Sequence, residues 1–279
     1  MGRPPGRAHD RPVLLALVLA SATILVAVVL LLPTISVRWR PPELRQPDEW
    51  RFSHRLEPVD GMAVSRRILT PDHELTIVRS DDDVAQCTVD LSRGPTDRGP
   101  HGSRVWIHGW RASYVEDPSR DPSLTWTYAP RAWVTVTCTR SAVSRSTQLE
   151  VARAVRFADA RIRLPFTLDT LPEGYRIFSV DEDTGSGTDV VSLGLQPVDR
   201  ASIPSVVVSY GGSGTAYRCL EPSAGAAQRI CLSTRWSAEE APGASAVVQR
   251  SLDRVAERIV PAPDPTDPTT WFDAIELPR

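Results

Sequence analysis

Cysteine and histidine are the residue types in this chain best suited to chemistry. The cysteines are Cys87, Cys138, Cys219 and Cys231, and the histidines beyond the N-terminal segment are His54, His73, His101 and His108. A cysteine nucleophile needs a base that the fold holds beside it, and a zinc site needs close pairs such as C-x-x-C. The sequence has no such spacing, and no histidine stands in a context that marks a dyad. We therefore expect no catalytic residue, no metal site and no cofactor.

Alternation along two expected strands predicts what the first two cysteines do instead. In AWVTVTCT, residues 132–139, Cys138 shares a face with both valines, whereas Trp133 lies on the other face. In QCTVDL, residues 86–91, Cys87 shares a face with the valine and the leucine. Both cysteines thus project from the more apolar face of their strands. A pair on neighbouring strands there suits a disulfide, and buried free thiols are the alternative.

The other two cysteines, Cys219 and Cys231, are separated by LEPSAGAAQRI, which reads as strand, loop and strand. Four cysteines allow three connectivities. We prefer Cys87–Cys138 and Cys219–Cys231, because each bridge then closes one folding unit on itself. Each would stabilise the fold by ~3–4 kcal/mol in the chain-entropy account of disulfides.

An uncharged apolar stretch, VLLALVLASATILVAVVLLL, occupies residues 13–32 and is followed by Pro33. A helix of this length covers about 30 Å, the thickness of the bilayer hydrocarbon. The stretch predicts a single-pass transmembrane helix that acts as an uncleaved signal anchor. A cleaved signal peptide is the alternative, but its apolar region usually runs about 7–15 residues and ends at a small-x-small site. The following LLPTIS offers no persuasive site of that kind.

Orientation follows from chain order more than from charge. The arginines that flank the span are equal in number, so the positive-inside rule does not decide its orientation. They are Arg3, Arg7 and Arg11 before it and Arg38, Arg40 and Arg45 after it. A short tail before a first apolar segment usually stays in the cytoplasm while the remainder is exported. We therefore expect residues 1–12 to be a cytoplasmic tail of a cell-membrane protein whose C-terminal part lies outside. Disulfides would suit that oxidising compartment.

Beyond the span, residues 33–50 are rich in proline and predict a stiff stalk. A faint internal repeat follows: FSHRLEPVDGMAVSRRI is similar to FTLDTLPEGYRIFSV, each with a glycine, Gly61 or Gly174, before a strand-like run. Each unit closes with an amphipathic stretch, SRSTQLEVARAVRF or SAVVQRSLDRVAERIV. In the first stretch, Thr147 and Glu150 have the spacing of a capping box.

These features predict an α+β fold. We expect a first unit over 51–162 and a second over 163–262, each with an antiparallel sheet and one C-terminal amphipathic helix. Hairpin turns are expected at His108-Gly109 and Pro130-Arg131. The tail, residues 263–279, is rich in proline and should be irregular. Its Trp271 and Phe272 either dock on the folded body or form a short motif for a partner.

Three tryptophans, Trp106, Trp110 and Trp133, are candidate binding residues. Trp106 and Trp110 could line an open face for a ligand such as a glycan or a peptide, although packing within the fold is the alternative interpretation. Trp133 lies on the face opposite Cys138 and is the residue of its strand better placed to meet a partner.

Two other motifs are weaker than they look. DEDTGSGTD, residues 181–189, has aspartates at calcium-loop positions one, three and nine, but lacks the required glycine and glutamate, so we expect a solvated turn. SYGGSGTAY, residues 209–217, lacks the lysine and helix of a phosphate loop. It also fails as a nucleophile elbow because Thr215 replaces the last glycine, so we expect a hairpin loop.

Composition excludes one class of partner and one modification. The net charge is −2, and acidic and basic residues are mixed without a basic block, which argues against nucleic-acid binding. All 32 basic residues are arginine, and the chain has no asparagine, so N-glycosylation is excluded.

Residues 104–157 carry a family resemblance. A hairpin with a central Gly109 is followed by Tyr114, by Leu124 and Trp126 in an L-x-W pattern, and by a strand and a VARAV helix. This order resembles extracytoplasmic modules of single-pass membrane proteins of actinobacteria, many of unknown function. It is also similar to the C-terminal domain of some membrane-bound anti-sigma-type regulators. The 12-residue tail is too short for a sigma-binding domain, so the resemblance implies a sensor-like or binding module and supplies no catalytic residues.

Our first hypothesis is a membrane-tethered, extracytoplasmic binding or scaffold module of the cell envelope without catalysis. Its partners would be membrane lipid, through the N-terminal helix, and an envelope protein or cell-wall component. The alternative is a cell-envelope hydrolase or transferase with a dispersed active site, which needs titratable groups that converge in one pocket. A subunit of a larger membrane complex is a third hypothesis, although the apolar stretch lacks GxxxG and strong polar contacts.

Overall fold

The computed structural model describes residues 44–46, 49–94, 102–139, 141–185, 189–199, 204–211, 218–220, 228–234 and 244–278. Residues 42–279 form one compact unit. The expected cytoplasmic tail, the expected transmembrane helix over 13–32 and most of the stalk lie outside the described residues. Among those described, no helix has the length and apolar character needed to cross a membrane.

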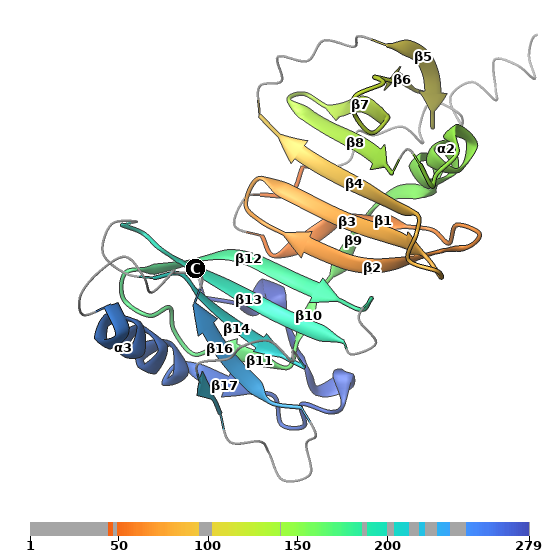
Figure 1. The fold of residues 1–279 in the computed structure, drawn as a ribbon. Coiled ribbons are helices and arrows are strands. Elements are labelled where there is room, and N and C mark those ends of the chain that lie inside the picture. Colours follow the sequence, from red (N-terminus) through yellow and green to blue (C-terminus); the bar gives the residue numbers. More distant parts are fainter. Residues whose placement is uncertain are drawn as a thin grey trace, which may run out of the picture. The chain divides into compact units, whose positions relative to one another are not determined.

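Strands dominate the described part of the chain (Figure 1). They are β1 (Arg51–Leu56), β2 (Met62–Leu69), β3 (His73–Ser80), β4 (Gln86–Arg93), β5 (Ser103–Ile107), β6 (Trp110–Val115), β7 (Ser123–Ala129), β8 (Ala132–Cys138), β9 (Val155–Arg161), β10 (Arg163–Leu164), β11 (Phe166–Leu168), β12 (Tyr175–Asp183), β13 (Val190–Pro197), β14 (Val206–Tyr210), β15 (Arg218–Cys219), β16 (Ile230–Thr234), β17 (Ile259–Pro261) and β18 (Phe272–Asp273). The helices are α2 (Arg145–Ala154), α3 (Ala244–Ala256) and the short 3₁₀ turns η1 (Pro268–Thr270) and η2 (Ala274–Glu276).

The predicted α+β class, with a separate sheet in each unit, is wrong. The described residues form a mostly β fold, in which one twelve-stranded sheet carries both halves of the chain. Its order is β15-β16-β14-β13-β12-β2-β3-β4-β8-β7-β6-β5, and three two-stranded sheets, β1-β9, β10-β18 and β11-β17, accompany it. The two helices are short additions of 10 and 13 residues.

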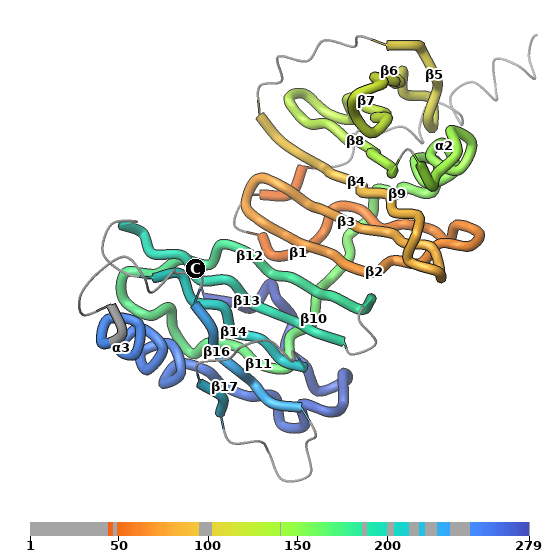
Figure 2. The backbone as a smooth tube through the Cα atoms, in the orientation of Figure 1, coloured from red at the N-terminus to blue at the C-terminus, as the bar shows by residue number. Residues whose placement is uncertain are grey.

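The two halves of the sheet join where β2 lies beside β12 (Figures 1 and 2). The strands pair antiparallel from Val180↔Leu69 to Asp183↔Arg66. Two ion pairs cross this seam, because Arg66 binds Asp181 with two nitrogens and the next residue, Arg67, binds Glu182. A strand edge left open would expose unpaired backbone groups. Pairing β2 with β12 satisfies both edges, which explains why one sheet forms instead of two.

The two halves follow a similar order of elements. In each, a short first strand pairs with the strand after the helix: β1 with β9, and β11 with β17. Gly61 and Gly174 precede the first long strand of each half, and both have positive φ, 68° and 81°. Glycine adopts such a backbone without steric cost, which suits it to both turns. The equivalent strands β2 and β12 are those that meet at the seam.

Two hydrophobic clusters fill the covered face of the sheet. The first core includes Leu124 and Val134, and the second core includes Leu193 and Val208. The alternation predicted for β8 is confirmed, since Val134, Val136 and Cys138 are buried while Trp133 is only partly so. Helix α2 adds Val151 to the first core. Helix α3 packs on β14 and β16 of the second. Both helices therefore lie on the same side of their strands as the core.

Helix α2 begins one turn earlier than its sequence suggests. Ser144 is the N-cap, and its Oγ accepts a hydrogen bond from the Thr147 N–H at 3.1 Å. The expected capping box of Thr147 and Glu150 is therefore wrong. Buried Gln148 fixes the helix to the sheet, since its Nε2 donates to the carbonyls of Pro122 and Val136 at 2.9 and 2.8 Å.

Both expected hairpin turns are confirmed. His108 and Gly109 connect β5 to β6 with positive φ at both residues, 49° and 82°. This backbone matches the twist of a two-residue hairpin. Arg131, with φ of 58°, turns the chain between β7 and β8.

The C-terminal tail docks on the body. Phe272 pairs with Leu164 in the β10-β18 ladder, and Trp271 packs on the second core with its ring edge-on to Tyr210. The Trp271 Nε1 donates to the Pro265 carbonyl at 2.9 Å. Of the two alternatives for this tail, the structure supports docking.

Candidate functional site

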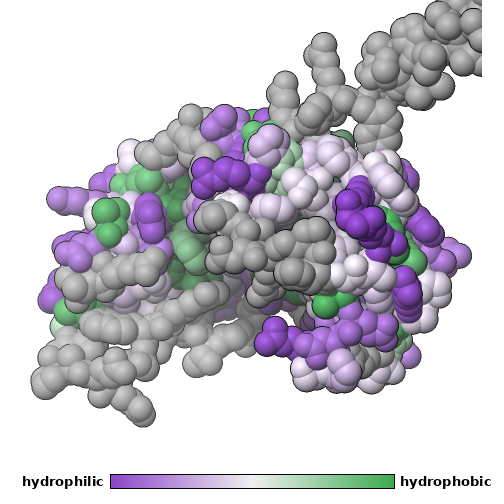
Figure 3. Space-filling view, turned by 90° about the horizontal axis from the view of Figure 1, so that it is seen from above, coloured by the Kyte–Doolittle hydropathy of each residue, from purple (hydrophilic) through white to green (hydrophobic). Residues whose placement is uncertain are grey.

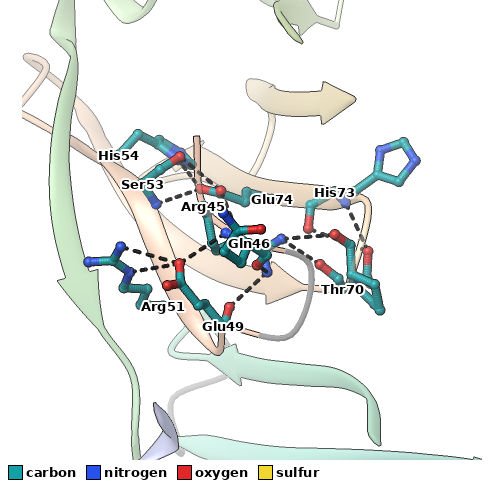
Figure 4. Close-up of polar contacts among 10 residues, drawn as sticks. Arg45, Gln46, Glu49, Arg51, Ser53, His54, Thr70, His73 and Glu74 are labelled. Atoms are coloured by element: carbon teal, nitrogen blue, oxygen red, sulfur yellow. Dashed lines mark hydrogen bonds and ion pairs between the residues drawn. The ribbon is translucent and has the colours of Figure 1, made fainter. Parts of the chain in front are cut away.

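A buried polar network lies where β1 packs on β3 (Figure 4). Glu74 is at its centre and is only 3% exposed. Its Oε1 accepts from Arg45 Nε at 3.1 Å and from Ser53 Oγ at 2.8 Å. Its Oε2 accepts from the Ser53 N–H at 2.8 Å and lies 3.1 Å from His54 Nδ1. Every lone-pair direction of this carboxylate therefore has a partner.

Arg45 belongs to the range predicted as stalk, yet it is 2% exposed. Besides Glu74, its guanidinium donates to the carbonyls of Glu49 at 2.8 Å and Thr70 at 2.7 Å. Trp50, also in the stalk range, is buried in the second core. The folded body thus begins before residue 51, and Arg45 fixes the incoming chain to the β2–β3 turn.

His54 also reaches Thr76, whose Oγ1 lies 3.1 Å from Nε2. The order threonine, histidine, carboxylate is that of a nucleophile, a base and an orienting acid. All three side chains are nevertheless buried: Thr76 is 3% exposed and His54 2%. A substrate carbonyl cannot reach Thr76 in this state. The geometry is that of a satisfied structural network in the core.

The network shifts the pKa of nearby groups. Burial alone raises the pKa of Glu74, but the hydrogen bond and charge of His54, the Ser53 N–H and the charge of Arg45 hold it below the ordinary 4.5. Burial, aided by the negative charge of Glu74, raises the pKa of Tyr128 to about 12. Glu74 is thus ionised and Tyr128 neutral at neutral pH.

His73 immediately precedes Glu74 in β3, but its side chain points away from Glu74 and His54 (Figure 4). It lies on the opposite face of the sheet, where Nδ1 is 3.3 Å from Asp90 Oδ1. This hydrogen bond, partly offset by burial, raises the pKa of His73 above its ordinary value. His108 stands apart at the β5–β6 turn, 2.7 Å from Arg156. The structure therefore does not bring these three histidines into one site, and His101 is outside the described residues.

The face of the sheet opposite the helices is mostly polar, with the partly exposed Ile68 and Leu75 at its centre. One unbroken row of cross-strand neighbours crosses all twelve strands. It consists of Cys219, Cys231, Ser209, Ser192, Asp181, Ile68, Leu75, Asp90, Thr135, Thr125, Ser113 and Arg104. We call this surface the open face. In the view of Figure 3, hydrophobic residues lie among hydrophilic ones over the surface.

Trp106 is the most exposed tryptophan of the described chain, at 68%. It lies on the open face in the edge strand β5, directly opposite Arg111 of β6. Arg104, two residues before it, shares its face. Both arginines are exposed. An aromatic surface between two cations is therefore presented to solvent at this edge.

Of the other two tryptophans, Trp133 lies on the open face and Trp110 does not. Trp133 is partly buried beside Thr127 and Ser92, and its Nε1 donates to the Gly94 carbonyl at 3.3 Å. Trp110 is opposite the buried Ile107 and packs on the first core. The expectation that Trp106 and Trp110 line one face is therefore wrong. Trp110 pairs with Ile107, the residue after Trp106, and successive residues of a strand point to opposite faces.

The predicted disulfides are both present, Cys87–Cys138 and Cys219–Cys231. The first is in the core, with its cysteines 0% and 1% exposed. The second is on the open face at the sheet edge, where Cys219 is exposed and Cys231 partly buried. Disulfides persist in oxidising compartments and are rare in the cytosol. They indicate that the folded part lies outside the cytoplasm.

The acidic motif is not the solvated turn that we expected over its full length. Asp181 to Asp183 complete β12, and Asp181 is used in the seam with Arg66. Residues 186–188 of this motif and residues 212–217 of the glycine-rich motif lie outside the described residues. Among the described residues, no group of three or more metal-binding side chains lies together.

Sequence reasoning did not find the Arg45–Glu74–His54 network. The signal that was available is the charge of Glu74 within a strand, two positions from Thr76, which puts both on one face. Arg45 gave no signal, because a single arginine in a proline-rich stretch looks like any other stalk residue. No protein-family model matches this chain, and no curated protein sequence is significantly similar to it.

Proposed function

We propose that this chain is a membrane-tethered, extracytoplasmic binding module of the cell envelope, and that it meets its partner on the open face without catalysing a reaction. The observation that carries the proposal is the exposed Trp106 between Arg104 and Arg111, on a sheet face opposite both helices. Single exposed apolar residues are common. A tryptophan flanked by two exposed cations on a broad polar face is the composition of a recognition surface.

The Arg45 contacts support the tethered part of this proposal. Residues 33–44 separate the apolar stretch from Arg45 in the sequence. Arg45 holds the chain at a fixed point of the body through Glu74 and the Thr70 carbonyl. A pull on the stalk would therefore act on β1 and β3 directly. The resemblance to actinobacterial single-pass membrane proteins agrees with this arrangement.

The alternative, a cell-envelope hydrolase or transferase, has less support. Its best candidate group is Thr76, His54 and Glu74, and all three are buried. Covalent catalysis by such a group requires a nucleophile that a substrate can approach. The more exposed His73 contacts Asp90 through Nδ1. Ser92 lies directly opposite His73, but among the described residues no hydrogen bond joins its hydroxyl to the imidazole.

Thiol labelling of intact cells that produce the full chain tests the location and the tether together. A membrane-impermeant maleimide should label the protein only after an impermeant reductant has been added, and without lysis. The protein should also remain with the membranes in alkaline carbonate. Labelling before reduction, labelling that requires lysis, or release by carbonate would each contradict the proposal.

A further inference from the structure

Four residues form a strip across the outer strands of the open face. Trp106 is opposite Arg111, and Thr127 is opposite Trp133. Arg111 and Thr127 follow the neighbouring Ala112↔Trp126 pair of β6 and β7. The strip therefore runs perpendicular to β5, β6, β7 and β8. With strands about 4.8 Å apart, the two tryptophans are separated by about 14 Å. We call these residues the tryptophan strip.

Positive charge along the strip is left for a ligand. In the part of the chain that the structure describes, neither Arg104 nor Arg111 has a carboxylate within ion-pair distance, and both are exposed. Arginines elsewhere on the sheet are used differently, since Arg66 and Arg67 are paired with acidic residues. An anionic ligand would gain two charge-assisted contacts beside Trp106 without displacing a carboxylate partner among the described residues.

Hydroxyl groups surround the strip. Three strands, β4, β7 and β8, contribute hydroxyl side chains that are at least partly exposed on the open face: Thr88, Ser92, Ser123, Thr125, Thr127, Thr135 and Thr137. The hydroxyl oxygens of Thr125 and Thr135 lie 3.2 Å apart and share a hydrogen bond. Such a surface offers donors and acceptors but little apolar area. A lipid acyl chain would find no apolar insertion site around Trp133. A hydroxylated ligand would find hydrogen-bond donors and acceptors there.

We propose that the tryptophan strip, with Arg104, binds an extended anionic glycan. The two indoles would each stack on the C–H face of a sugar ring, the threonines would bind ring hydroxyls, and Arg104 and Arg111 would bind the anionic substituents. The length of the strip suits several consecutive sugars. This inference rests on the proposed function, because it names the ligand class of the same open face.

Calorimetric titration of the full chain in phosphatidylcholine nanodiscs tests the ligand class. The probes are a hyaluronan hexasaccharide, which bears carboxylates, chitohexaose, which is neutral, and a polyphosphate chain, which lacks sugars. We expect hyaluronan to bind more tightly than either of the others. W106A should weaken hyaluronan and chitohexaose alike by about tenfold, as the loss of an interface anchor does. The R104Q/R111Q double variant should instead abolish the preference for hyaluronan over chitohexaose.

Phe178→Ala and Arg176→Gln are the matched controls, because they remove an exposed aromatic ring and an exposed arginine from β12. Both should bind hyaluronan like the unmodified chain. Equal binding of polyphosphate and hyaluronan, or unchanged affinity in W106A, would overturn the glycan assignment. Loss of hyaluronan binding in phosphatidylglycerol nanodiscs would show that the strip lies on an anionic membrane and would also overturn it.

The glycan ligand and the exported binding module are separate claims, and different results would contradict each. If no glycan probe binds, yet a photo-crosslinker at position 106 still captures an envelope component in cells, the ligand class is wrong and the binding module stands. If the intact-cell labelling fails as well, the exported, tethered module itself is wrong.

Discussion

At the scale of single residues, Glu74 and Arg45 are the most demanding part of the fold. Two buried charges cost several kcal/mol of desolvation each, and their attraction offsets this only when the geometry and the remaining hydrogen bonds are good. Here the carboxylate has four partners and the guanidinium adds main-chain carbonyls. The pair therefore adds little net stability, but it specifies where the incoming chain sits.

Removing one member of this pair should be costly. Glu74→Gln leaves Arg45 buried without a counter-charge, and we expect the free energy of unfolding at pH 7 to fall by about 3–5 kcal/mol. Asp90→Asn removes a more exposed carboxylate from the next strand and should cost less than about 1 kcal/mol. Urea unfolding of the full chain in detergent measures both. A similar loss of unfolding free energy in the two variants would contradict the cost expected for an unpaired, buried Arg45.

The same variant should change the response to acid. The pKa of Glu74 is lower in the folded than in the unfolded protein, so its contribution is present above the ordinary 4.5 and is lost as the pH falls through the folded value. The free energy of unfolding should therefore decline less steeply below pH 4.5 in E74Q than in the unmodified chain. Parallel declines would contradict this account.

His73 should titrate above an ordinary histidine because Asp90 stabilises its charged form. Any stability from this pair is present below the unfolded pKa of 6.5 and is lost as the pH rises through the folded value. Asp90→Asn should lower the pKa of His73, as measured by NMR titration of the imidazole, with His73→Gln to assign the signal. An unchanged pKa in D90N would show that Asp90 does not hold the proton.

At the scale of elements, the two disulfides occupy contrasting places. Cys87 and Cys138 are directly opposite each other in the central strands β4 and β8, beneath helix α2. Cys219 and Cys231 join β16 to the two-residue edge strand β15. An attacking thiolate must reach a sulfur atom before exchange can occur. Exposure, more than strand pairing, should therefore decide how readily each bond is reduced.

We expect Cys219–Cys231 to be reduced first in the folded protein. With increasing dithiothreitol followed by alkylation and mass spectrometry, Cys219 and Cys231 should be modified well before Cys87 and Cys138. The core pair should react only under conditions that unfold the chain. The C219S/C231S variant supplies the control, since its remaining disulfide should stay unreactive under native conditions. Equal rates for both bonds would contradict the assignment.

Strand positions could be predicted from the sequence because alternation is a local property. The pattern of AWVTVTCT places Cys138 with two valines whatever lies beside the strand, and the structure buries all three. In ELTIVRS the same rule misleads, because Leu75 and Ile77 look like the core face. The structure instead buries Glu74, at 3% exposure, and leaves Leu75 partly exposed. A buried charge becomes visible only when its partners, Arg45 and His54, are in place.

At the scale of the whole molecule, the feature that sequence reasoning could not supply is the seam. Arg66 and Asp181 are 115 residues apart, and each belongs to a charged pair of residues that looks like a solvated turn or edge. Only the approach of β2 to β12 converts these charges into cross-strand partners. That joining turns two expected sheets into one and makes the open face continuous from Arg104 to Cys219.

The most direct test of the central claim, that the open face is the binding surface of an exported module, is photo-crosslinking in intact cells. Benzoylphenylalanine replaces Trp106 in one full-length variant and Val198 in another, because these residues are equally exposed, at 68% and 69%. Position 106 should give a discrete adduct with a cell-envelope component, and R104Q/R111Q should weaken it, while position 198 gives none. Adducts of equal yield from both positions, or none from position 106, would contradict the claim.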